Sequence, residues 1–108
     1  MGLGISVQET KKLLDLGSPL RLIDVREADE FDICKIQGAE LIPLSAFAEE
    51  FSKRLPQTEA RILLYCHHGM RSMHAAEYLA HRGYSNVSSV DGGIDAWARE
   101  IDPAVARY

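Results

Sequence analysis

The sequence predicts an α/β fold in which helices cover both faces of a parallel sheet. Short apolar runs of strand length alternate along the chain with segments of helical spacing. Those runs lack the polar alternation of a strand with one face in water, so we expect them to be buried on both faces. The 108 residues are 46% hydrophobic and 26% charged, as is usual for one globular domain. We therefore expect a single domain over residues 1–108.

The first half of the chain begins with a capping box, Ser6 to Glu9, followed by three leucines. This pattern predicts a helix that runs to about Gly17, where a Gly-Ser-Pro sequence ends it. Three shorter elements follow: a buried strand at 20–25, an acidic helix at 27–32, and a strand at 40–42 that stops before Pro43.

The second half opens with a helix at 44–55, whose apolar side chains recur on one face up to Pro56. The most apolar run, Ile-Leu-Leu-Tyr, predicts a buried strand at 61–65, and a loop from Cys66 to Arg71 follows it. Three elements complete the chain: a helix at 72–82 closed by Gly83, a strand at 87–90, and a helix at 94–100 after an Asp-Gly-Gly turn.

The loop after the most apolar strand is the candidate site, because ligands of such sheets bind beyond the carboxyl ends of the strands. Free N–H groups at the next helix start, a curled loop made feasible by Gly69, and the fixed charge of Arg71 all favour a Cys66 thiolate. The thiolate is the nucleophilic form of cysteine. The alternative is a packed apolar cysteine in a loop that only connects two elements.

The charge distribution bears on which partners the protein can bind. The net charge of −4 argues against general nucleic-acid binding. Residues 61–84 nevertheless carry +2 and all four histidines, which favours a site for a small anion, although chance could also place them there. We find no signal sequence and no apolar stretch of membrane-spanning length, so we expect a cytoplasmic protein without a membrane partner.

The segment Tyr65-Cys66-His67-His68-Gly69-Met70-Arg71-Ser72 resembles the active-site loop of the rhodanese-like domains, which are sulfurtransferases. The resemblance covers nearly the whole chain in order. Its other segments are Asp24-Val25-Arg26 with Glu30-Phe31, Gly38-Ala39 with Ile42-Pro43, and Asp91-Gly92-Gly93-Ile94-Asp95-Ala96-Trp97. It implies a three-layer α/β/α fold around a mostly parallel five-stranded sheet.

Two details refine this resemblance. Members of the family usually carry Gly-His where this chain has Cys34-Lys35, and the second thiol is either a resolving cysteine or a plain substitution. Related phosphatases of this fold have five residues between the loop cysteine and arginine, whereas four separate Cys66 from Arg71. The shorter loop favours sulfur transfer over phosphate ester hydrolysis.

The resemblance implies that Cys66 is the catalytic residue and carries a persulfide. The expected substrate-binding residues are those that follow it in the loop, namely His67, His68, Gly69, Met70 and Arg71. Asp24 and Arg26 either edge the same pocket or form a charge pair that fixes the loop after their strand. Ser72 is expected to cap the following helix.

We expect no cofactor and no metal, since Cys66, His67 and His68 lack the spacing of zinc ligands. The expected partners are a small anionic sulfur donor such as thiosulfate and a protein that gives or takes persulfide sulfur. An alternative function is a protein-to-protein sulfur relay, because residues 92–108 resemble the tail of rhodanese-like domains fused to sulfur-carrier adenylyltransferases. A thiol phosphatase or arsenate reductase and a non-catalytic binding domain are the remaining alternatives.

Overall fold

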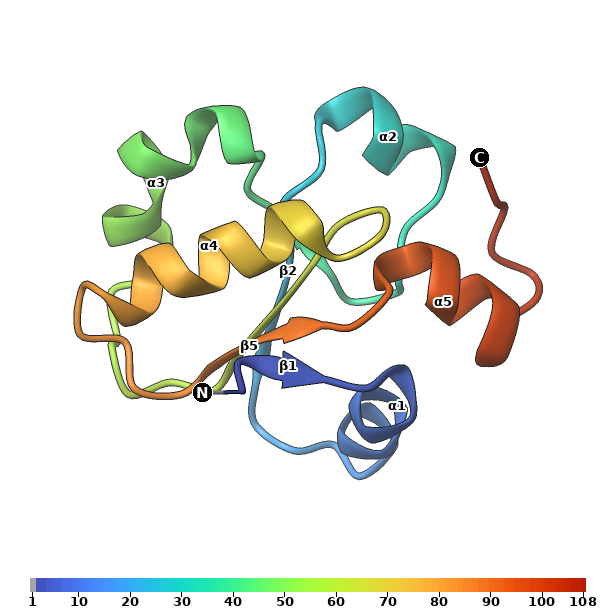
Figure 1. The fold of residues 1–108 in the computed structure, drawn as a ribbon, viewed down its shortest axis with the longest axis horizontal. Helices are drawn as coiled ribbons and strands as arrows, with labels where there is room; N and C mark the ends of the chain where they lie inside the picture. Colours follow the sequence, from blue (N-terminus) through green and yellow to red (C-terminus); the bar gives the residue numbers. More distant parts are fainter. Residues whose placement is uncertain (1) are drawn as a thin grey trace.

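The computed structural model describes residues 2–108, in which strands and helices alternate (Figure 1). The strands are β1 (Gly4–Ile5), β2 (Arg21–Asp24), β3 (Glu40–Leu41), β4 (Ile62–Tyr65) and β5 (Val87–Val90). The helices are α1 (Val7–Asp15), α2 (Ala28–Ile33), α3 (Phe47–Arg54), α4 (Met70–Ala80) and α5 (Gly93–Glu100), with a 3-10 helix η1 (Leu44–Ala46) before α3.

The strands form one sheet in the order β1-β5-β4-β2-β3, and every neighbouring pair is parallel. The predicted fold class is therefore confirmed. Parallel strands require crossover connections, and the helices supply them on both faces of the sheet. In Figure 1, α1 and α5 lie on one side of the sheet and α3 and α4 on the other.

Strand β4 shows how the sequence builds these layers, because all four of its residues are buried. Ile62 and Leu64 belong to the apolar cluster that includes α3 and α4 residues, whereas Leu63 and Tyr65 belong to the cluster with α1 and α5. Successive side chains of a strand point to opposite faces, so an uninterrupted apolar run is needed here. Cys66 continues the alternation and belongs to the α4-side cluster.

Besides small shifts at the ends of several elements, three differences from the sequence prediction matter for the fold and the site. Strand β1 was not predicted from its residues, because two residues at a sheet edge carry no readable periodicity. The helix expected at 44–55 is divided into η1 and α3. Helix α4 begins at Met70, two residues before the predicted start at Ser72, and this shift changes the chemistry of the site.

The parallel register brings the carboxyl ends of β2 and β4 to the same edge of the sheet. Asp24, the last residue of β2, pairs in register with Tyr65, the last residue of β4. The loop that begins with Cys66 therefore emerges beside the segment that follows Asp24. None of the helices formed by residues 2–108 has the length and apolar character needed to cross a membrane.

Candidate active site

The Cys66 sulfur lies against the amino-terminal end of helix α4. The side chain is 1% exposed, and its Sγ accepts the backbone N–H of Gly69 at 3.1 Å and that of Ser72 at 3.3 Å. Gly69 is the N-cap of α4, and Ser72 is its third residue. The first N–H groups of a helix have no partner within it, so the sulfur takes the place of a capping acceptor.

Ser72 is a site residue that the sequence prediction assigned to a different task. It does not cap α4, since the helix already begins at Met70. Its hydroxyl lies 3.5 Å from Cys66 Sγ and 2.7 Å from the hydroxyl of Ser89, and it donates to the Gly69 carbonyl at 3.2 Å. All these groups are buried or half-buried, so the sulfur lies beside a network of ordered hydrogen-bonding groups.

The amino-terminal end of helix α5 docks on the other side of the same loop. Ile94 donates its N–H to the carbonyl of Cys66 at 2.8 Å, and Asp95 donates to the carbonyl of His67 at 3.1 Å. The loop therefore receives the free N–H groups of two helices, those of α4 on its sulfur and those of α5 on its carbonyls. The Gly92–Gly93 turn at the start of α5 therefore passes close to the site.

A shallow pocket of about 290 Å³ opens at the loop. Its lining residues are Cys66, His67, His68, Met70, Arg71 and His74. The loop residues expected to bind substrate thus line the pocket, except Gly69, which contributes its N–H to the sulfur. His74, exposed on the second turn of α4, was not among the expected site residues.

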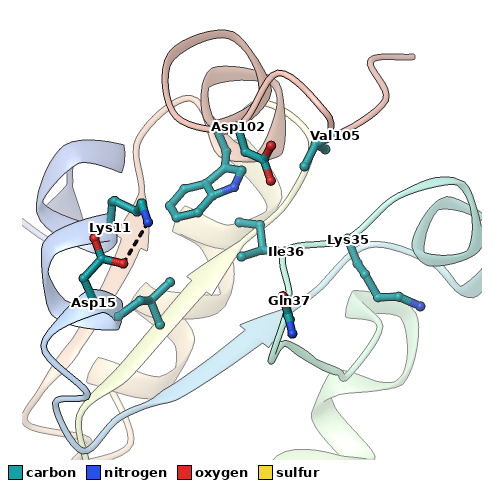
Figure 2. A pocket seen from close by; sticks show the side chains of 9 residues that line it. Lys11, Asp15, Lys35, Ile36, Gln37, Asp102 and Val105 are labelled. Atoms are coloured by element: carbon teal, nitrogen blue, oxygen red, sulfur yellow. Dashed lines mark hydrogen bonds and ion pairs between the residues drawn. The ribbon is translucent and has the colours of Figure 1, made fainter.

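A larger cavity, about 530 Å³, lies elsewhere and shares no lining residue with the pocket at Cys66. Figure 2 shows it between α1, the segment around Ile36, helix α5 and the tail, with Asp102 on one wall. Trp97 also lines it. Its charged lining residues include both positive and negative side chains, and Lys11 already pairs with Asp15. We therefore place the candidate chemistry at Cys66.

Arg71 is held by a carboxylate that the sequence prediction did not assign to the site. Its two terminal nitrogens donate to the two carboxylate oxygens of Glu30 at 2.7 and 3.0 Å. The hydrogen bonds from Arg71 lower the pKa of Glu30 to about 2, and the same contacts raise the pKa of Arg71 above its ordinary value. The positive charge expected at the loop end is consequently shared with Glu30 on α2.

Asp24 and Arg26 form a buried ion pair and do not line the pocket. Both side chains are 0% exposed, and Arg26 Nη2 lies 2.6 Å from Asp24 Oδ2. Arg26 also donates to the carbonyls of Cys34 at 2.6 Å and of Glu30 at 3.2 Å. Burial opposes its charge, but hydrogen bonds with Asp24 and Tyr108 keep the pKa of Arg26 above the ordinary arginine value. Of the two roles weighed from the sequence, the geometry matches a charge pair that fixes the chain after β2.

His67 is enclosed by two other rings. Its ring stacks on His68 with centroids 4.0 Å apart and on Tyr108 with centroids 3.9 Å apart. Burial, together with the nearby charge of His68, lowers the pKa of His67. Its Nε2 has no hydrogen-bond partner within residues 2–108. His67 therefore stays neutral down to a lower pH than an exposed histidine would.

His67, His68 and Asp95 each place one possible metal-ligand atom within 4.8 Å of the others. This set differs from the cysteine and histidine set considered from the sequence. Both carboxylate oxygens of Asp95 already accept hydrogen bonds, one from Arg99 at 3.0 Å and the other from Arg107 at 3.1 Å. Two arginines beside the carboxylate oppose the binding of a cation.

The second cysteine packs on the opposite side of the sheet from the first. Cys34 borders the apolar cluster of α1 and α5, whereas Cys66 belongs to the cluster of α3 and α4. Both thiols are free, and Cys34 Sγ lies 3.9 Å from Arg26 Nη1. Of the two interpretations of Cys34, this placement favours a plain substitution over a resolving thiol.

Residues 6–100 match the family model described as a rhodanese-like domain. The chain belongs to the rhodanese-like domain family. The domain is 40% identical over 99% of its length to a probable adenylyltransferase/sulfurtransferase, MoeZ, of Mycobacterium tuberculosis. It covers only 27% of MoeZ, so the chain spans about a quarter of the length of the curated relatives it matches.

Solved structures agree with this assignment. The human single-domain sulfurtransferase TSTD1 superposes with a TM-score of 0.81 at 25% identity, over 93% of this chain and 98% of that chain. A thiosulfate sulfurtransferase from Pseudomonas aeruginosa gives a TM-score of 0.80 at 29% identity, over 92% of this chain and 19% of that chain. The rhodanese-like domain is thus related to sulfurtransferases in both sequence and structure.

The Glu30–Arg71 pair predicts a specific acid sensitivity. The pKa of Glu30 is about 2 in the folded domain against 4.5 ordinarily, so between these values the unfolded chain binds more protons. Stability from this pair is therefore fully present above pH 4.5 and is lost as the pH falls toward 2. Glu30→Gln should cost about 1–2 kcal/mol at pH 7 and flatten the decline, as urea unfolding between pH 2 and 7 would measure.

Glu40→Gln is the matched control, because Glu40 pairs with Arg21 on side chains that are more than one third exposed. Its effect at pH 7 should stay below about 1 kcal/mol. An unfolding profile of Glu30→Gln that parallels the wild type through the acid range would show that the Arg71 pair carries no folding energy.

Proposed function

We propose that this domain transfers sulfane sulfur from a small anionic donor, such as thiosulfate, to a thiophilic acceptor through a persulfide on Cys66. The observation that carries the proposal is the Cys66 sulfur at the base of a pocket with two backbone N–H groups aimed at it. Such donors stabilise negative charge on Sγ and on a sulfur atom attached to it. Relatives named as sulfurtransferases support the reaction class.

In the first step, the Cys66 thiol loses its proton to solvent, and the thiolate attacks the outer sulfur of the donor. A bond forms between Sγ and that sulfur, the sulfur–sulfur bond of thiosulfate breaks, and sulfite leaves with the bonding electrons. In the second step, an acceptor nucleophile attacks the outer sulfur of the persulfide, and the Cys66 thiolate is regenerated. This is covalent catalysis in two steps and implies ping-pong kinetics.

The pocket residues have distinct tasks in this scheme. The N–H groups of Gly69 and Ser72 hold the charge on the sulfur, while Arg71 offers its guanidinium to the anionic oxygens of the donor. Because Arg71 is also paired with Glu30, it binds the donor as a positioned and partly neutralised cation. Met70, 75% exposed, forms an apolar rim.

A second candidate is a relay module that receives sulfur from one protein and passes it to another. The similarity to MoeZ, whose name joins an adenylyltransferase to a sulfurtransferase, favours it. The same Cys66 persulfide serves both functions, so the donor separates them. An enzyme should turn over thiosulfate and cyanide many times, whereas a relay should accept sulfur from a protein persulfide and be poor with thiosulfate.

The test is the intact mass of the protein after incubation with thiosulfate, with and without reductant. We expect a gain of one sulfur atom that reductant removes. Cys66→Ser should abolish the gain, and the matched variant Cys34→Ser should retain it, because Cys34 lies on the other side of the sheet. Sulfur retained by Cys66→Ser would overturn the proposal. A gain from a protein persulfide alone would favour the relay.

A further inference from the structure

The segment that follows α5 returns to the candidate site. It turns at Asp102, whose N–H bonds the Trp97 carbonyl at 2.9 Å, and Arg107 then pairs with Asp95 on the first turn of α5 at 3.1 Å. Figure 1 shows this red tail rising from the end of α5 toward α2. Its last residue, Tyr108, thereby reaches residues far earlier in the chain.

The ring of Tyr108 covers one face of His67. The two rings are nearly parallel, at 5° with centroids 3.9 Å apart, and His68 covers the opposite face at 4.0 Å. His67 directly follows Cys66 and lines the pocket. A ring stacked on both faces cannot change orientation without breaking a contact, so Tyr108 restricts the loop next to the sulfur.

The hydroxyl of Tyr108 joins two charged groups of opposite sign. Its oxygen accepts from Arg26 Nη1 at 2.9 Å and donates to Glu30 Oε2 at 2.8 Å. Burial raises the pKa of Tyr108 to about 12, so the hydroxyl keeps the proton that it donates. Glu30 in turn holds both terminal nitrogens of Arg71.

These contacts form one chain of alternating partners from the core to the pocket: Asp24, Arg26, Tyr108, Glu30 and Arg71. Its inner end is fixed, since the first two side chains are fully buried. Its outer end is a long side chain that is 35% exposed and would otherwise sample several rotamers. Tyr108 is the member that connects the fixed pair to the Glu30 carboxylate.

We propose that Tyr108 is a positioning residue that holds Glu30 and His67, and thereby orients Arg71 and the Cys66 loop toward an anionic sulfur donor. The inference rests on the proposed function for its substrate class, but the contacts that carry it are independent of sulfur chemistry. Without the hydroxyl, Glu30 loses a donor, and its negative charge beside the pocket residue Arg71 is less compensated. An anionic reactant should then approach Cys66 less readily.

The experiment compares Tyr108→Phe, which keeps the stack and loses both hydrogen bonds, with Tyr108→Leu, which loses both features. Tyr78→Phe is the matched control, because it removes a hydroxyl from a partly buried ring in the α3–α4 aromatic cluster. The first readout is the rate of Cys66 alkylation by anionic iodoacetate relative to neutral iodoacetamide, followed by peptide mass so that Cys34 is counted separately.

We expect the iodoacetate-to-iodoacetamide ratio to fall about threefold in Tyr108→Phe and about tenfold in Tyr108→Leu, with no change in Tyr78→Phe. With thiosulfate, the KM should rise by similar factors while kcat changes less. The NMR-measured pKa of His67 should rise in Tyr108→Leu, since its ring becomes exposed, and should hold in Tyr108→Phe.

Two results would separate this inference from the proposed function. Alkylation ratios in both Tyr108 variants that match Tyr78→Phe would overturn the positioning by Tyr108, whatever the domain does with thiosulfate. If the alkylation ratio falls in the Tyr108 variants but the wild-type protein never takes up sulfur, the positioning by Tyr108 stands and the proposed function is overturned. Tyr108→Phe keeps the aromatic contact, so it guards against a Tyr108→Leu variant that fails to fold.

Discussion

A Gly93→Ala variant is expected to lose about 3–5 kcal/mol of unfolding free energy and to slow sulfur uptake on the order of 100-fold. Gly93 has a φ of +60°, and a methyl group there would lie 2.5 Å from the His67 carbonyl oxygen and closer still to that of Cys66. Both oxygens accept N–H groups from α5, so neither can move away without breaking a hydrogen bond. The loop that presents the Cys66 sulfur would have to shift.

The matched control is Gly83→Ala. Gly83 also has a positive φ, +90°, but a methyl group there meets nothing within 4 Å. Its cost should therefore be that of the backbone conformation alone, about 1–2 kcal/mol, with unchanged sulfur uptake. Urea unfolding and intact mass after thiosulfate treatment measure both effects. Equal losses in the two variants would show that the close approach of Gly93 to the loop is not needed for the site.

The sheet was predictable because its signal is local. The run at 62–65 is apolar at every position, and this pattern alone indicates a strand covered on both faces. Strand β1 carried no such signal, since it consists of a glycine and an isoleucine at the edge, and only the family resemblance implied a fifth strand. That most of the residues directly after Cys66 line one pocket was likewise predictable, because they are contiguous and their sequence pattern is specific.

The partners of the loop were harder to predict, because they come from distant parts of the chain. Glu30 was part of the resemblance but had no expected contact with Arg71, 41 residues later. Tyr108 had no predicted role, although it stacks on His67. Ser72 was misplaced because its residue type suits an N-cap, whereas the left-handed conformation of Gly69 starts the helix earlier. Propensity describes a residue alone, and tertiary contacts decide its final environment.

Arg26→Met is expected to cost about 3–5 kcal/mol, because it leaves Asp24 without a counter-charge in a fully buried position. Arg21, the first residue of β2, supplies the control, since Asp24 is the last residue of that strand. Arg21 pairs with Glu40 on side chains that are 37% and 36% exposed, so Arg21→Met should cost only about 0–1 kcal/mol. Urea unfolding at pH 7 compares them, and similar losses would mean that burial of the Asp24–Arg26 pair has no special energetic consequence.

The double variant Asp24→Leu/Arg26→Met identifies which interactions of Arg26 matter. If the unpaired charge of Asp24 dominates, removing it should recover about 1–3 kcal/mol relative to Arg26→Met. If the double variant is no more stable, the loss comes from the carbonyls of Cys34 and Glu30, which Arg26 also binds. In either case Tyr108 loses the donor that ties it to the core. The ratio of iodoacetate to iodoacetamide alkylation at Cys66 should therefore fall as it does in Tyr108→Phe, even in the more stable double variant.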